Sequence, residues 1–67
     1  MGIGRNIAKL RRQKNWSQKE LARRAGVSVD YLYRVETGKC PHLPIKLLSR
    51  IAEALDVQLG ELYEENS

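Results

Sequence analysis

Residues 17–39, SQKELARRAGVSVDYLYRVETGK, predict two short helices joined by a tight turn. Ser17 is suited to cap the first helix by accepting a hydrogen bond from the Glu20 amide while the Glu20 side chain reaches back, which makes a capping box. Gly26 tolerates the left-handed backbone conformation that ends many helices. Ser28 is the N-cap candidate of the second helix. The stretch therefore contains the signals for both helix starts and for the turn between them.

The spacing of small and apolar residues in this stretch predicts how the two helices cross. Helices that cross steeply at short range need a small residue at their contact, and Ala22 provides one. Val27 fills the gap between the helices, while Leu32 and Val35 hold the second helix against the first. The opposite side of the second helix stays free. This arrangement is the geometry of a helix-turn-helix, which we expect over about residues 17–37.

Apolar residues recur at helical spacing on both sides of this stretch. We expect one helix from about residue 3 to residue 14 and another that begins at Pro44, a residue suited to a first helical position. The expected core faces of these two helices contain Ile3, Ile7 and Leu10, and Ile45, Leu48, Ile51, Ala52 and Leu55. Leu59, Leu62 and Tyr63 are expected to anchor a last short helix before a fraying tail of residues 64–67. The prediction is one compact all-α domain of five short helices over residues 1–67.

The composition argues against several classes of protein. The chain has 67 residues, which is room for one domain. With one cysteine, Cys40, and one histidine, His42, an internal disulfide is excluded and a zinc site is not expected. We find no signal-peptide pattern and no run near the roughly 20 apolar residues of a membrane span, so we expect a cytoplasmic protein. Because the length leaves room for one domain, we expect no sensor domain beside it. Neither a catalytic constellation nor a motif for a cofactor or small-molecule ligand is recognisable, so we do not expect an enzyme.

Basic residues are concentrated in the first part of the chain. Residues 1–39 contain ten Lys and Arg against three acidic residues, a net charge of +7, whereas residues 40–67 contain two against five, a net charge of −3. Such a distribution gives one face of a fold a positive field that attracts a polyanion. Charge alone leaves a nucleic acid partner and an ordinary solvated surface as about equal alternatives.

The combined motif resembles the Cro/CI (XRE-type) helix-turn-helix family of phage and bacterial regulators. The resemblance is carried by Ser17 to Ala22, Ala25 to Ser28 and Leu32 to Lys39, with Leu48, Ile51, Ala52, Leu55 and Val57 matching a fourth helix, and it covers about residues 3–63. It implies a five-helix, lambda-repressor-like DNA-binding domain whose third helix enters the major groove. The chain departs from the family's pattern at Val29, where a polar residue is usual, and at the bulky Tyr31 and Tyr33. These departures concern the base preference and not the fold.

Four residues on the free side of the third helix are candidates for reading bases: Val29, Asp30, Tyr33 and Arg34. An arginine such as Arg34 pairs with guanine through N7 and O6, and a valine such as Val29 packs on a thymine methyl group. Asp30 is suited either to accept from a cytosine amino group or only to complement the positive end of the helix dipole. Tyr33 is suited to stack on a sugar or donate to a phosphate, with a half-buried position at the core edge as the alternative.

A second set of residues is suited to contact the DNA backbone, which positions a protein without reading sequence. The set contains Gln18, Lys19, Ser28, Tyr31, Thr37 and Lys39. In the resembling family the position of Gln18 contacts a phosphate and braces the third helix. Tyr31 is expected to be partly buried, with a hydroxyl that either reaches a phosphate or makes no contact with the DNA. The resemblance also implies a structural pair of Arg11 and Glu36, against the alternative of two independent surface charges.

Proteins of this type usually bind as two-fold dimers, because one recognition helix reads few base pairs. We therefore expect a homodimer on a pseudo-palindromic stretch of double-stranded DNA. The candidate dimer contacts are Leu47, Ala54, Leu59, Leu62 and Tyr63, with completion of the small core as the alternative role of these residues. A second reading of the same fold is a protein-interaction module, an antitoxin or a coactivator adaptor, because Val29, Tyr31 and Tyr33 are unusually apolar.

Overall fold

The computed structural model describes residues 2–40 and 42–63, and within them it contains helices and no β-strand. The elements are α1 (Ile3–Gln13), α2 (Gln18–Ala25), α3 (Val29–Glu36), α4 (Ile45–Leu55) and the 3-10 helix η1 (Leu59–Leu62). The all-α prediction is therefore confirmed. The expected frayed tail of residues 64–67 lies outside the described residues.

The expected count of five α-helices is wrong, because the last element is a single 3-10 turn. Its bonds span three residues, from the Glu61 amide to the Gln58 carbonyl at 2.9 Å and from the Tyr63 amide to the Gly60 carbonyl at 3.1 Å. Gln58 and Glu61 cap the turn reciprocally. A four-residue element that contains the poor helix former Gly60 does not add the bonds of a continuing α-helix.

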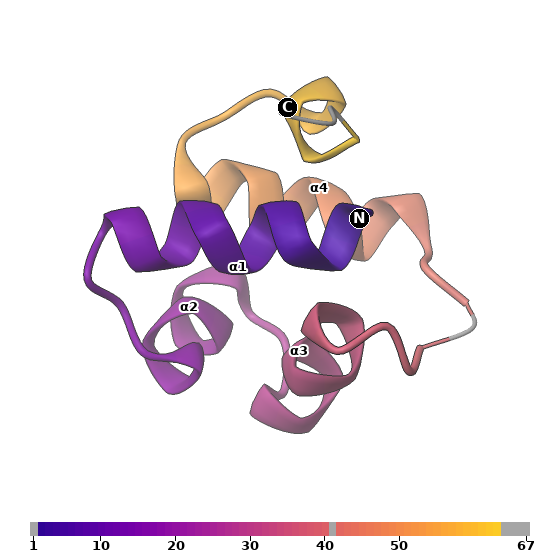
Figure 1. The fold of residues 1–67 in the computed structure, drawn as a ribbon, viewed down its shortest axis with the longest axis horizontal. Coiled ribbons are helices and arrows are strands. Elements are labelled where there is room, and N and C mark those ends of the chain that lie inside the picture. The colour runs from indigo at the N-terminus through magenta and orange to yellow at the C-terminus, as the bar shows by residue number, and fades with distance from the viewer. Residues whose placement is uncertain (1, 41, 64–67) are drawn as a thin grey trace.

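The helices form two levels and a cover (Figure 1). α1 and α4 run through the middle of the molecule and contact each other, while α2 and α3 lie below them and η1 lies above. α2 packs mainly on α4, and α3 packs on α1 and α2. One side of α3 is consequently left at the lower edge of the molecule.

Two serines and a glycine set the ends of α2 and α3 as predicted. The Ser17 Oγ accepts from the Glu20 amide at 3.0 Å, and the Ser28 Oγ accepts from the Tyr31 amide at 3.0 Å. Gly26 has a φ of 73° and ends α2 in the left-handed conformation. The expected return bond of the Glu20 side chain is wrong. The Glu20 carboxylate instead accepts from Arg23 at 2.6 Å and from Arg24 at 2.5 Å, which are stronger donors than a backbone amide.

The core is built from apolar side chains of every element. The fully buried large side chains are Ile7, Leu21, Leu32, Leu48, Ile51, Leu55 and Leu62. The predicted core position of Ile45 is wrong, because its side chain is 63% exposed. Ile45 is the first residue of α4, just after the N-cap Pro44, and it precedes the turn that packs on the core.

None of the described helices is long and apolar enough to cross a membrane. In the same part of the chain, no three His, Cys, Asp or Glu side chains come together in a group that could hold a metal ion.

Candidate nucleic-acid interface

A buried polar network joins the first three helices. Arg11 of α1 donates to both carboxylate oxygens of Glu36 at the end of α3, with Nε to Oε2 at 2.9 Å and Nη2 to Oε1 at 3.1 Å. The Gln18 side chain of α2 donates to Glu36 Oε1 at 3.0 Å. The side chains of Arg11 and Glu36 are 10% and 4% exposed. The pair implied by the family resemblance is therefore present, and Gln18 makes it a three-helix network.

The network leaves neither charge unpaired in the interior. The remaining Arg11 nitrogen, Nη1, donates to the Trp16 carbonyl at 2.7 Å. Forked, bidentate geometry of this kind is both strong and directional. Because Glu36 is the last residue of α3, the network fixes the end of α3 relative to α1 and the start of α2.

Gly4 permits the second close contact between α1 and α3, and the sequence prediction missed it. A Cβ atom on Gly4 would lie 2.1 Å from the Val35 carbonyl oxygen and 3.1 Å from the Glu36 Cα. Both neighbours are backbone atoms, which cannot rotate away. A glycine inside a predicted amphipathic helix was the available signal, because such glycines often mark a packing requirement.

The outer side of α3 carries the four candidate base-reading residues at its surface. Val29 and Tyr33 are 47% and 46% exposed. Asp30 and Arg34 lie one turn apart, with Arg34 Nε 3.2 Å from Asp30 Oδ2, and their side chains are more than half exposed. The inner side of the same helix buries Leu32 and Val35. The structure thus brings all four candidates onto one solvent-facing surface.

The backbone-contact candidates fall into two groups. Lys19, Ser28, Thr37 and Lys39 are exposed at the ends of α2 and α3. The Thr37 hydroxyl donates to the Tyr33 carbonyl at 2.8 Å, so it also closes the last turn of α3. Gln18 is partly buried and its amide nitrogen is directed at Glu36, which matches the bracing role.

The Tyr31 hydroxyl does not lie at the surface, where a phosphate contact would need it. The Tyr31 hydroxyl is buried and has no hydrogen-bond partner among the described residues. Its ring packs against the core, because Tyr31 lies on the side of α3 that turns toward the interior. The expected partial burial of Tyr31 is therefore observed.

Burial raises the pKa of the Tyr31 hydroxyl above its ordinary value. Desolvation of the hydroxyl raises the pKa of Tyr31, and the negative charge of a Cys40 thiolate raises it further. The pKa of Tyr31 is higher in the folded than in the unfolded protein. Its protonated hydroxyl therefore contributes fully to the free energy of unfolding below the unfolded pKa, and this contribution is lost as pH rises through the folded pKa. We expect alkaline ultraviolet titration to show one of the three tyrosines ionising last, with loss of stability in that range. Tyr31→Phe should remove this late step, and three tyrosines that titrate together would contradict the assignment.

Two positively charged side chains, Lys14 and Arg24, lie over the Trp16 ring beside the network. The Arg24 guanidinium stacks over the Trp16 ring at 4.3 Å from its centroid, and Lys14 Nζ lies 5.3 Å from it. Trp16 itself is partly buried against the core. The Arg24 side chain remains 45% exposed while its guanidinium covers the indole face.

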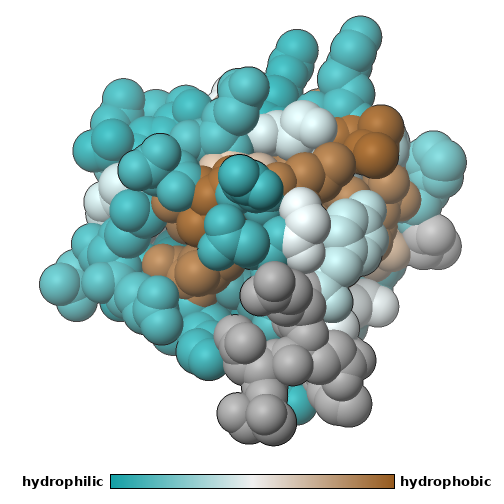
Figure 2. Space-filling view, turned by 90° about the horizontal axis from the view of Figure 1, so that it is seen from above, coloured by the Kyte–Doolittle hydropathy of each residue, from teal (hydrophilic) through white to brown (hydrophobic). Residues whose placement is uncertain are grey.

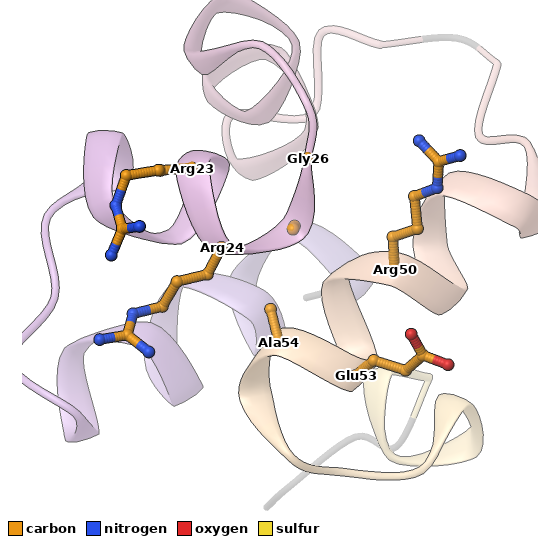
Figure 3. A pocket seen from close by; sticks show the side chains of 7 residues that line it. Arg23, Arg24, Gly26, Arg50, Glu53 and Ala54 are labelled. Carbon is orange, nitrogen blue, oxygen red and sulfur yellow. The ribbon is translucent and has the colours of Figure 1, made fainter.

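A shallow pocket lies on another side of the molecule, between the end of α2 and α4 (Figure 3). Arg23, Arg24, Arg50 and Glu53 line it, but their charged ends point in different directions. Arg23 and Arg24 both donate hydrogen bonds to the Glu20 carboxylate. These bonds lower the pKa of Glu20, and the bond from Arg23 raises the pKa of Arg23. The pocket therefore lacks a set of converging groups that would bind a ligand.

The helix-turn-helix family model matches residues 7–62 of the sequence. The chain belongs to the XRE-type helix-turn-helix family. A relative from this family is the HTH-type transcriptional regulator SlrR of Bacillus subtilis (strain 168), which is 36% identical over 62 residues, 92% of this chain and 41% of SlrR. The resemblance to this family that the sequence shows over about residues 3–63 is confirmed.

Solved structures of the family have the same fold. A crystal structure of SinR, the master regulator for biofilm formation, in complex with DNA is 35% identical and superimposes with a TM-score of 0.85, covering 90% of this chain and 95% of that one. A SinR protein/SinI protein complex is also 35% identical and gives a TM-score of 0.88, covering 94% and 61%. This chain spans about half the length of the curated relatives SlrR and SinR.

The candidate dimer residues are distributed between core and surface. Leu62 is fully buried in the core of its own chain, the alternative role given above, so it is not available to a partner. Ala54 and Leu59 are partly buried against the core, Leu47 is half-buried, and Tyr63 is 56% exposed. Figure 2 shows a band of apolar surface on the face seen from above, bordered by hydrophilic side chains.

Proposed function

We propose that the chain is a sequence-specific DNA-binding transcriptional regulator that inserts α3 into the major groove. One observation carries the proposal. The side of α3 with Val29, Tyr33 and Arg34 is open to solvent, while its other side is held by the core and by the Arg11–Glu36–Gln18 network. The major groove is wide enough for an α-helix, and base reading needs side chains in fixed positions.

The chemistry of the exposed residues fits this role. Arg34 has the donors for guanine N7 and O6, and Val29 supplies an apolar contact for a thymine methyl group. Lys19, Ser28, Thr37 and Lys39 lie at the helix ends, where they would contact phosphates. The net charge of +7 over residues 1–39 would attract the DNA backbone. The SinR complex with DNA is a precedent in the same family.

We propose further that two copies bind a pseudo-palindromic operator. Two recognition helices reach the same side of a duplex only if the copies meet beside the helix-turn-helix and not behind it. α4 begins at such a lateral edge, next to the loop after α3 (Figure 1), and its first residue, Ile45, is 63% exposed. Ile45 therefore joins the half-buried Leu47 as a dimer candidate, whereas Leu62, which is buried, and Tyr63, which follows η1 on the level away from α2 and α3, do not meet this condition. We expect sedimentation equilibrium to give a dimer that Ile45→Asp weakens, and a monomer at all concentrations, with and without DNA, would refute it.

A protein-interaction role is the second candidate. Val29 and Tyr33 are large apolar side chains that are nearly half exposed on α3, and SinR occurs in a complex with the SinI protein. An enzymatic role has no comparable support, because the relatives are transcriptional regulators.

Selection from a random duplex library at physiological salt tests the proposed function. We expect enrichment of an inverted repeat whose half-sites lie about one helical turn apart. The enriched site should lose affinity with Arg34→Ala, while Arg50→Ala, a charge-matched control on α4, should leave the base preference unchanged. Binding that is independent of sequence and disappears with salt would contradict the proposal and favour a purely electrostatic contact or a protein partner.

A further inference from the structure

Asp30 is an acidic side chain in the middle of the surface that should approach DNA. Its carboxylate is 69% exposed and would be repelled by phosphates. It lies in the first turn of α3, where it complements the helix dipole. A dipole role alone does not require the contact that Asp30 makes with Arg34.

The contact between Asp30 and Arg34 involves one edge of the guanidinium group. Asp30 Oδ2 lies 3.2 Å from Arg34 Nε. A guanidinium has a side edge formed by Nε and one terminal nitrogen, and an end edge formed by both terminal nitrogens. Because the Asp30 carboxylate lies on the Nε side of the guanidinium as an ion-pair partner, the end edge is left for another pair of acceptors. Guanine presents such a pair, O6 and N7, in the major groove.

The ion pair contributes little in the free protein, because both side chains are well exposed to water. In a groove from which water is displaced, the same pair becomes stronger. The side chain of Arg34 would then enter the complex with fewer alternative orientations, which favours one bidentate contact over loose contacts with phosphates.

We propose that Asp30 is a positioning residue that makes Arg34 selective for guanine. The inference rests on the proposed sequence-specific DNA binding and assigns different roles to two residues of α3. Arg34 supplies the donors, and Asp30 fixes which edge of the guanidinium faces the bases while it weakens attachment to phosphates. Asp30 thus raises specificity at the expense of general affinity.

The test compares the affinity of the protein for two duplexes. The first is the selected site, and the second carries 7-deazaguanine, which lacks the N7 acceptor, in place of one guanine. The replaced guanine is the one that the parent protein prefers and the Arg34→Ala variant does not. A good bidentate pair discriminates by about tenfold or more, so we expect about that ratio for the parent protein. Asp30→Asn should reduce the ratio several-fold toward that of Arg34→Ala and should increase binding to the modified duplex. Asp30→Glu should restore part of the ratio, because it returns the carboxylate.

Glu20→Gln is the matched control, because it removes an acidic partner of two arginines on α2 and leaves α3 untouched. It should change binding to both duplexes by the same factor. Thermal melting of each variant measures the contribution of Asp30 to the helix dipole separately, because loss of that contribution lowers the melting midpoint without changing the ratio of the two affinities.

Three results count against the inference, and they differ in what they say about the proposed function. An Asp30→Asn variant that keeps the parent ratio overturns the positioning role and leaves the proposed function intact. A parent protein that binds all duplexes alike overturns the proposed function and the inference with it. Loss of binding to both duplexes by one factor also counts against positioning, since it reports only on the stability or charge of α3.

Discussion

Replacing Glu36 with alanine should lower the free energy of unfolding by about 3–5 kcal/mol, the range for removal of one partner from a buried ion pair. The substitution leaves the Arg11 guanidinium buried with only the Trp16 carbonyl as its partner. It also removes the acceptor of the Gln18 amide. Chemical denaturation followed by circular dichroism measures the change.

The exposed ion pairs of α2 provide the control for this experiment. Glu20→Ala also removes a carboxylate that accepts from two arginines, but these ion pairs are exposed to water. The substitution should therefore change the free energy of unfolding only slightly. A double variant with Met at both position 11 and position 36 should recover much of the lost stability, because apolar residues of similar volume avoid the buried unpaired charge. If Glu36→Ala proves as mild as Glu20→Ala, the network does not hold α3 in place.

Gly4→Ala should destabilise the protein by about 1–3 kcal/mol, the usual effect of forcing an extra methyl group into a packed contact. Helix propensity alone predicts the opposite sign, because alanine is favoured over glycine inside a helix by roughly 0.5–1 kcal/mol. The new Cβ would overlap the Val35 carbonyl, so α1 and α3 must move apart. We expect the displaced α3 to bind the selected duplex more weakly as well.

Gly60→Ala is the matched control for Gly4→Ala. A Cβ atom at Gly60 meets no atom within 4 Å, and its φ lies outside the left-handed region. Thermal melting should therefore give an unchanged or slightly higher midpoint for Gly60→Ala and a lower one for Gly4→Ala. A Gly4→Ala variant as stable as the parent would mean that the close approach of α1 and α3 is not required.

Local signals in the sequence predicted the parts of the fold that depend on neighbouring residues. Ser17 and Ser28 cap their helices because an N-cap needs only an amide three residues ahead. Gly26 ends α2 because a single φ above zero is enough. The apolar spacing of Leu32 and Val35 correctly separated the inner side of α3 from its outer side.

Features that depend on contacts between distant segments were missed or left undecided. Gly4 matters only because the end of α3 approaches it, and the position of the Tyr31 hydroxyl depends on how α3 rotates against the core. Glu20 had two sets of possible donors, and the arginines displaced the backbone amide. Residues 59–62 form a 3-10 helix, in which hydrogen bonds join residues three apart and not four apart as in an α-helix. The spacing of apolar residues over so short a stretch does not distinguish the two.

The central claim is that the outer side of α3 is the surface that meets DNA. The most direct measurement is the change in amide chemical shifts of the labelled protein as the selected duplex is added. The largest changes should fall on residues 28–34 and on the start of α2, where Gln18 and Lys19 lie. Largest changes around residues 23–26 and 50–54, at the arginine-lined pocket between α2 and α4, with residues 28–34 unaffected, would contradict it.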